Sequence, residues 1–171
     1  MPRGDAAVKV ALLMGSDSDW TRLEPCYAAL RGLAIECEVR VLSAHRSPKA
    51  LVDYVEQAPA RGVRVFLCAA GGAAHLAGVV AAHTALPVLG IPIDNPPLNG
   101  LDALLSTVQM PGGVPVATFG TGTGGPLNAA LFAARLLALS DAALAARVQT
   151  SRAEQAAQVA EKDARLRAKI G

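Results

Sequence analysis

Aromatic side chains and unbalanced charge are both scarce in this sequence. Phe, Trp and Tyr make up 4% of the 171 residues, so few side chains offer a flat surface on which a nucleic-acid base could stack. The 16 basic and 14 acidic residues leave a net charge of only +2 and are spread along the chain. This balance provides no electrostatic attraction to nucleic acid or to an anionic membrane, and we expect neither as a partner.

Cysteine is also sparse and forms no recognisable framework. Cys26, Cys37 and Cys68 are odd in number, far apart and never arranged as Cys-x-x-Cys. This pattern is typical of a reduced, cytoplasmic protein with unpaired thiols that are mostly buried. The segment Met1–Ala7 is short and charged, without the apolar stretch of a signal peptide, and we therefore expect a cytoplasmic location.

Only one hydrophobic run is long enough to suggest a membrane span, and it is interrupted. Residues 65–82 are nearly all apolar, but Gly71 and Gly72 break the run in the middle and His75 lies inside it. We interpret the run as a buried strand, a tight turn and a buried helix.

The rest of the chain alternates between strand-like and helix-like segments. With 52% apolar residues, it can bury the core of one domain. Strands are predicted at 8–14, 35–42, 63–69, 87–91 and 114–119, and helices at 18–31, 48–62, 73–83, 101–108, 126–139 and 141–169.

This alternation predicts an α/β fold with three layers, αβα, around a doubly wound parallel sheet of five strands. The second strand alternates apolar and charged residues, which is typical of an edge strand, so the flavodoxin-like order 2-1-3-4-5 fits best. We expect residues 1–171 to form a single catalytic domain with its core at 8–139. The C-terminal helix at 141–169 has only a thin apolar stripe, and we expect this helical extension to pack on a neighbouring subunit.

The turn Ser43–Pro48 combines three groups suited to a ligand site. Pro48 at the first helical position, with Ser47 before it as N-cap, predicts that a helix begins directly after the turn. Helix-end N–H groups and the fork of Arg46 suit an anion such as phosphate. His45 is the only group of the turn that exchanges a proton near neutral pH. The alternative is a capped turn with a solvated His and Arg.

Two other turns fall on the same predicted edge of the sheet. Gly15–Asp19 contains four possible capping residues in a row, one of which (Asp17 or Ser18) suffices for a helix cap. Its hydroxyls could hold a phosphate, and an Asp carboxylate suits ribose hydroxyls. Ala70–His75 contains two glycines that allow backbone to approach a flat ligand, although it could simply be a tight strand–helix turn.

The segment Gly120–Gly125 matches the Gly-x-Gly-x-x-Gly pattern of dinucleotide sites. The pattern belongs to a strand–helix–strand unit, however, and no strand is predicted after it. The signal is therefore weak, and the glycines are better explained by close passage of the chain past a ligand or a neighbouring subunit.

Taken together, these motifs closely resemble those of the N5-carboxyaminoimidazole ribonucleotide mutases, the PurE proteins of purine biosynthesis, over residues 8–139. The resemblance rests on the segments GSDSDW at 15–20, SAHRSP at 43–48, AGGAAHL at 70–76, VQMP at 108–111 and NAAL at 128–131. It implies a flavodoxin-like subunit in a homo-octamer, an imidazole ribonucleotide as substrate, and no metal or cofactor.

The resemblance also implies a role for each turn. His45 would be the catalytic proton-transfer residue, Asp19 would meet the ribose, and the phosphate would lie among Ser16, Ser18, Ser43 and Arg46. Gly71, Gly72, Ala73 and His75 would line the pocket for base and carboxylate, and Ala44, Ala70 and Leu76 complete the expected substrate-binding set.

Two alternatives remain open from the sequence. A related class carboxylates aminoimidazole ribonucleotide directly with carbon dioxide, but it tends to carry Lys after the His, and Arg46 favours the mutase. A non-catalytic nucleotide- or flavin-binding module of flavodoxin type is disfavoured by the scarcity of aromatic residues.

Overall fold

The computed structural model describes residues 9–171, which fall into two compact units that divide after Ala133. Each unit is described by itself. The segment Met1–Ala7 and the expected first strand residue, Val8, lie outside the described residues.

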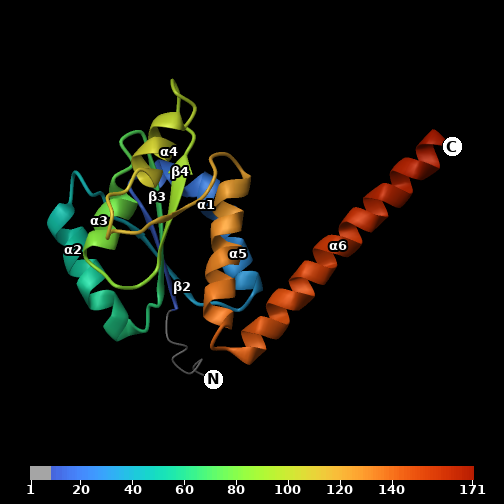
Figure 1. Ribbon diagram of the computed structural model, residues 1–171, viewed down its shortest axis with the longest axis horizontal. Helices are drawn as coiled ribbons and strands as arrows, with labels where there is room; N and C mark the ends of the chain where they lie inside the picture. Colours follow the sequence, from blue (N-terminus) through green and yellow to red (C-terminus); the bar gives the residue numbers. More distant parts are fainter. Residues whose placement is uncertain (1–8) are drawn as a thin grey trace. The chain divides into compact units, whose positions relative to one another are not determined.

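The first unit is built on a parallel sheet of five strands, in the predicted order β2-β1-β3-β4-β5 (Figure 1). The strands are β1 (Val10–Met14), β2 (Cys37–Val41), β3 (Val65–Gly71), β4 (Val88–Ile93) and β5 (Ala117–Thr118). The order changes direction between β1 and β3, so their carboxyl ends diverge and leave room for a ligand.

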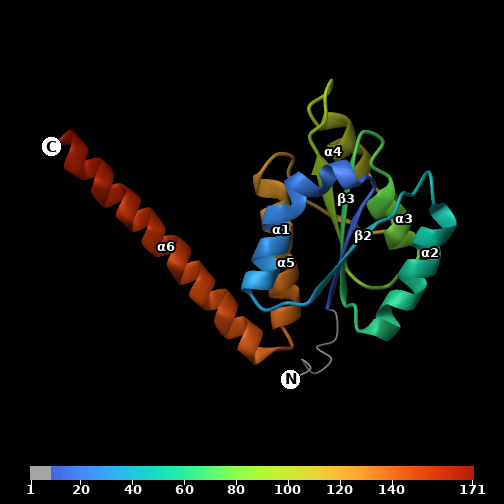
Figure 2. The same cartoon turned by 180° about the vertical axis from the view of Figure 1, so that it is seen from behind.

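Helices cover both faces of the sheet, as expected for a parallel sheet (Figures 1 and 2). The helices are α1 (Trp20–Gly32), α2 (Pro48–Gln57), α3 (Leu76–Ala82), α4 (Leu101–Val108) and α5 (Gly124–Ala138), with short 3-10 segments η1 (Asp17–Asp19) and η2 (Ala58–Arg61). Both views show α2 and α3 on one face, and α1 with the part of α5 before Ala134 on the other.

The core explains why this sheet is buried on both sides. All five residues of β1 are buried, so the strand reads as a continuous apolar run. Leu13 and Phe66 point to the α2/α3 face, where they join Leu51 and Val80 in one cluster. The predicted membrane-like run is β3 followed by α3, and no helix among residues 9–171 is long and apolar enough to cross a membrane.

The two outer strands, β2 and β5, differ in how well they agree with the strands predicted from the sequence. β2 is only partly covered, with Val41 52% exposed, which confirms the predicted edge strand. β5 is shorter than the predicted strand at 114–119, because only Leu89 and Gly90 of β4 pair with it. Pro115 has no N–H to donate to a neighbouring strand, and this limits the ladder before Ala117.

The ends of the turns also differ from prediction. β3 continues to Gly71, and α3 begins at Leu76 rather than at 73, because tight turns close from Ala74 N to Gly72 O and from His75 N to Ala73 O. Ser47 occupies the predicted N-cap position, but its hydroxyl donates to Ser43 O and accepts from Ser43 N instead of capping α2.

The first helix is capped in two steps rather than by Asp17 or Ser18. Ser16 caps the short η1 by accepting from the Ser18 N–H, and Asp19 takes the N-cap position of α1 without a side-chain hydrogen bond to the backbone of that helix. One turn of 3-10 helix therefore separates the strand end from α1, and it presents the hydroxyls of Ser16 and Ser18 at the edge of the sheet.

The second unit, residues 134–171, holds the end of α5 and the long helix α6 (Ala142–Ile170). Asp141 begins α6 as N-cap, and its carboxylate accepts from Leu144 N at 2.9 Å. Val159, Leu166 and Ile170 are more than half exposed on this helix. Its packing on a neighbouring subunit stays a prediction.

Candidate active site

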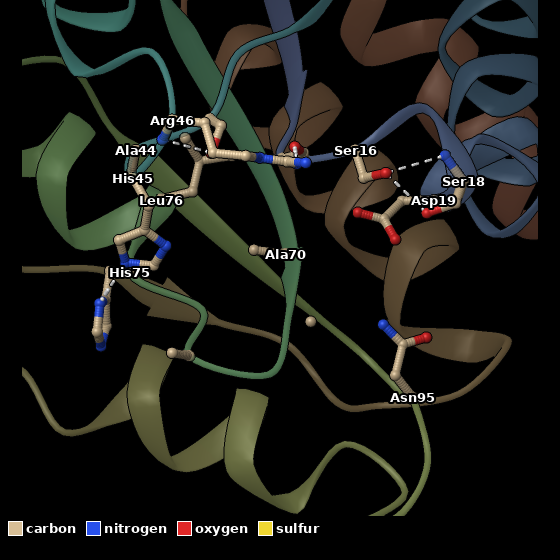
Figure 3. Close-up of a pocket in the computed structure, with 14 residues that line it drawn as sticks. Ser16, Ser18, Asp19, Ala44, His45, Arg46, Ala70, His75, Leu76 and Asn95 are labelled. Atoms are coloured by element: carbon tan, nitrogen blue, oxygen red, sulfur yellow. Dashed lines mark hydrogen bonds between the residues drawn. The ribbon is translucent and has the colours of Figure 1, made fainter.

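The turns that follow β1, β2 and β3 surround one cavity of about 340 Å³ at the carboxyl edge of the sheet (Figure 3). Every residue of the predicted site lines this cavity except Gly72. Gly72 has φ +63° and serves the turn after β3, a left-handed conformation that glycine adopts without steric cost. Two lining residues were not in the predicted set, Gly15 and Asn95.

One part of the cavity is rich in hydrogen-bond donors. The Ser18 hydroxyl donates to Ser16 Oγ at 2.8 Å, so the two side chains form one polar patch. Arg46 reaches across from the turn after β2, and its Nη2 donates to Gly15 O at 2.8 Å. The backbone N–H of Arg46 donates to Ser43 Oγ at 3.1 Å, and its Nε donates to the same oxygen at 3.5 Å, which ties the guanidinium to the serine beside it. A guanidinium held among three hydroxyls suits a phosphomonoester.

Asp19 lies beside this patch and is nearly fully buried, with 4% of its surface exposed. Burial raises the pKa of its carboxyl above the ordinary value, while the positive charge of Arg22 and a hydrogen bond from the Ser16 backbone oppose the rise. A buried carboxylate that lines a cavity is well suited to accept hydrogen bonds from the hydroxyls of a ligand.

The two imidazoles of the cavity are in direct contact. His45 Nε2 and His75 Nδ1 are 2.8 Å apart, and the rings meet edge to face at an angle of 82°. One ring must donate and the other accept, so the contact holds only while at least one of these two nitrogens is unprotonated. The pair can therefore store and release a single proton next to a bound ligand.

The floor near the histidines is made of small residues. Ala70, Gly71 and Ala73 line the cavity there and offer little but backbone and methyl groups. Such a surface accepts a flat ring closely and excludes water from it. Among residues 9–171, no three His, Cys, Asp or Glu side chains are grouped so that they could hold a metal ion.

Comparison with known proteins identifies the family. The family model described as AIR carboxylase matches residues 9–158. The chain belongs to the AIR carboxylase family. Its members include proteins named N5-carboxyaminoimidazole ribonucleotide mutase. That of Brucella melitensis is 49% identical over 91% of this chain and 96% of the relative. That of Mycobacterium tuberculosis is 49% identical over 95% of this chain and 92% of the relative.

Solved structures agree with this assignment to the AIR carboxylase family. PurE of Treponema denticola superimposes with a TM-score of 0.79 at 30% identity, covering 92% of this chain and 97% of that one. A variant of PurE2 from the same organism gives a TM-score of 0.84 at 28% identity, covering 92% of this chain and 96% of that one.

The glycine-rich segment Gly120–Gly125 does not line the cavity. It leads into α5, and α6 rather than a strand follows, so the strand–helix–strand unit of a dinucleotide site is not formed there. A Cβ at Gly125 would collide with the carbonyl of Gly120, which shows that close passage of the chain requires glycine at this point.

Asn95 is the lining residue that lies outside every predicted motif, whereas Gly15 belongs to the segment GSDSDW. Asn95 lies in the Pro-rich loop after β4, a segment with no recognised motif. The signal that could have found it is topological: β4 ends at the same edge of the sheet as β1 and β3, so polar residues directly after it fall near the cavity.

Proposed function

We propose that this protein is an isomerase of purine biosynthesis, an N5-carboxyaminoimidazole ribonucleotide mutase. The reaction moves a carboxylate from the exocyclic nitrogen of the substrate to C4 of its imidazole ring. The observation that carries the proposal is the contact of His45 with His75 in the same cavity as Arg46 and its neighbouring hydroxyls. The names of the 49% identical relatives support it.

Different residues of the cavity bind the phosphate, the ribose and the imidazole of the ribonucleotide. The phosphate binds to Arg46 and to the hydroxyls of Ser16, Ser18 and Ser43, since charge-assisted hydrogen bonds from these donors are strong and directional. Asp19 accepts from the ribose. The imidazole lies over Ala73, which brings its exocyclic nitrogen and C4 toward the two histidines.

The reaction requires one group of the protein to donate a proton to the substrate and later to accept a proton from it. The bond between the exocyclic nitrogen and the carboxylate carbon breaks, carbon dioxide leaves, and His45 as the acid supplies a proton to that nitrogen. C4 of the resulting aminoimidazole is a nucleophilic enamine carbon and attacks the carbon dioxide. His45, now neutral, removes the C4 proton, and the ring becomes aromatic again. No electron leaves the system, so these steps need no oxidant or reductant.

His45 is the better candidate for this proton transfer than His75. His75 is the N-cap residue of α3, whereas His45 lies in the same turn as Ser43 and Arg46, next to the phosphate patch. His45 therefore transfers the proton, and His75 acts as its hydrogen-bond partner. The small apolar floor retains carbon dioxide beside C4 between the two halves of the reaction.

We also propose a cytoplasmic homo-oligomer, an octamer as the resemblance to the mutases implies. Large apolar side chains are exposed on α4 and the loop before it, including Leu98, Leu101 and Leu105, and others are exposed on α6. Exposed apolar surface of this kind is typical of subunit interfaces, and closed symmetry satisfies it on every copy.

The direct test is conversion of N5-carboxyaminoimidazole ribonucleotide to its C4-carboxy isomer by chelator-treated protein without ATP or bicarbonate. A mutase forms the product under these conditions. Product that appears only when carbon dioxide is added would replace the proposal with the direct carboxylase, and a protein inactive under both conditions would contradict both.

A further inference from the structure

Asn95 lines the cavity, but the proposed reaction assigns it no role. It is the only lining residue that comes from the loop after β4. In Figure 3 its carboxamide lies across the cavity from His45 and His75, on the side of Asp19, whose carboxylate points into the same space. None of the hydrogen bonds found among residues 9–171 uses the side-chain amide of Asn95.

Two contacts fix the loop that carries this residue. Arg22 of α1 holds the preceding residue, with Nε 2.6 Å from Asp94 Oδ1 and Nη2 3.2 Å from Asp94 O. The Asn95 N–H donates to Ile93 O at 3.1 Å, so the chain turns immediately after β4. The backbone of Asn95 is therefore held in place before any ligand arrives.

Gly71 makes room for the carboxamide itself. A Cβ at Gly71 would collide with Asn95 Nδ2 and lie 3.2 Å from its Cγ. The side chain of Asn95 consequently packs directly over the backbone at the end of β3. It occupies the space that the side chain of any residue larger than glycine at position 71 would fill. A side chain held in this way loses little conformational entropy when a ligand binds it.

The chemistry of Asn95 complements that of Asp19. An ionised carboxylate only accepts hydrogen bonds, whereas a carboxamide offers both a donor and an acceptor. Of two neighbouring sugar hydroxyls, one can donate a hydrogen bond to the Asp19 carboxylate. The other can donate to the carboxamide oxygen of Asn95 or accept from its NH₂ group. The phosphate patch and the histidine pair occupy other parts of the cavity, which leaves the sugar as the part of a ribonucleotide nearest these two residues.

We propose that Asn95 is a second ribose-binding residue, which with Asp19 selects a sugar that carries both hydroxyls. This inference rests on the proposed function, because it takes the ligand to be an imidazole ribonucleotide. It makes the sugar, and not only the phosphate and base, a determinant of specificity at this site.

The test is calorimetric binding of 5-aminoimidazole ribonucleotide, which lacks the carboxylate and so reports on phosphate, sugar and ring alone. Asn95→Ala should weaken binding about three- to tenfold, the range for a hydrogen bond between uncharged groups. Asn99→Gly is the matched control, because Asn99 lies in the same loop outside the cavity at φ +49°, which glycine adopts freely. It should bind as the wild type does.

The 2′-deoxy and 3′-deoxy analogues then separate a sugar contact from any other effect. For one of the two deoxy analogues, Asn95→Ala should weaken binding by less than about twofold, because that analogue already lacks the hydroxyl that Asn95 binds. An equal penalty for all three ligands, or no penalty for the ribonucleotide, would overturn the role of Asn95 and leave the proposed function standing. Wild-type protein that binds none of the three would overturn both.

Discussion

Among single residues, two side chains in sharply different environments, His45 and Asp19, matter most for the proposed function. His45 is exposed in the cavity and shares a hydrogen bond with His75, so it can exchange a proton with a ligand. Asp19 is buried, and its raised pKa reflects the cost of holding a charge away from water. His45 is therefore suited to catalysis. Asp19 holds a poorly solvated carboxylate in the cavity, where hydrogen bonds from a ligand would stabilise its charge.

Replacement of His45 by Asn should abolish proton transfer without removing the binding site. Asn is similar in size and still forms hydrogen bonds, but it does not titrate. We expect kcat to fall at least about a hundredfold, the usual contribution of a general acid or base, while ribonucleotide affinity changes little. Steady-state kinetics with His83→Asn as control provides the measurement, because His83 ends α3 outside the cavity. Full turnover by the His45 variant would transfer the role to His75.

Replacement of Asp19 by Asn should stabilise the fold at neutral pH while weakening ribonucleotide binding. Because the folded-state pKa of Asp19 is raised, its charge destabilises the protein above that pKa and has no such effect below the ordinary pKa of Asp. The gain in stability of the variant should therefore be largest near neutrality and disappear as the pH falls through this window. Urea unfolding of both proteins across this pH range measures the difference; a gain independent of pH would show that the charge of Asp19 is not the cause.

Sequence reasoning found most residues of the cavity because they lie in motifs directly after strands. It could not predict that His45 and His75 would touch, since 30 positions separate them and only the parallel pairing of β1 with both β2 and β3 brings their turns together. Asn95 was missed because its loop after β4 carries no recognised motif, although the predicted strand order places the end of β4 at the same edge as the other turns.

At the scale of elements, glycine sets how closely the helices approach the sheet. A Cβ at Gly90 of β4 would collide with the side-chain methyl of Thr107 in α4 and lie 3.1 Å from Val116. The small residue at this position therefore allows α4 to pack closely on β4.

Gly90→Ala should consequently cost about 1–3 kcal/mol of unfolding free energy, the range for overpacking a filled core. Gly112→Ala is the matched control, because its Cβ would meet no atom within 4 Å, and it should stay within about 0.5 kcal/mol of wild type. Denaturant unfolding of the two variants makes the comparison, and equal stability would contradict the close packing described for β4 and α4.

The number, direction and order of the strands could all be predicted from sequence, because most strands are apolar runs bounded by turn residues and the alternating pattern of the second strand marks an edge of the sheet. Strand lengths could not. β5 is cut short by a missing N–H at Pro115, and the tight turns after Gly72 delay the start of α3, both of which depend on local hydrogen bonds rather than on periodicity.

At the scale of the whole molecule, exposed apolar surface predicts self-association. Leu101 and Leu105 are each about half exposed on α4, and Ile170 is 76% exposed near the end of α6. We expect a closed homo-oligomer, an octamer, when purified protein is measured by multi-angle light scattering at micromolar concentration. A stable monomer under those conditions would contradict this prediction.

In the proposed reaction, one site releases and recaptures the same carbon dioxide. The most direct measurement follows a ¹³C label placed in the carboxylate of N5-carboxyaminoimidazole ribonucleotide, with excess unlabelled bicarbonate in the buffer and His45→Asn protein as the background. Most of the label should appear in the C4 carboxylate of the product, because the cavity holds carbon dioxide beside C4 until the new bond forms. Product whose carboxylate has the isotopic composition of the buffer would contradict this prediction.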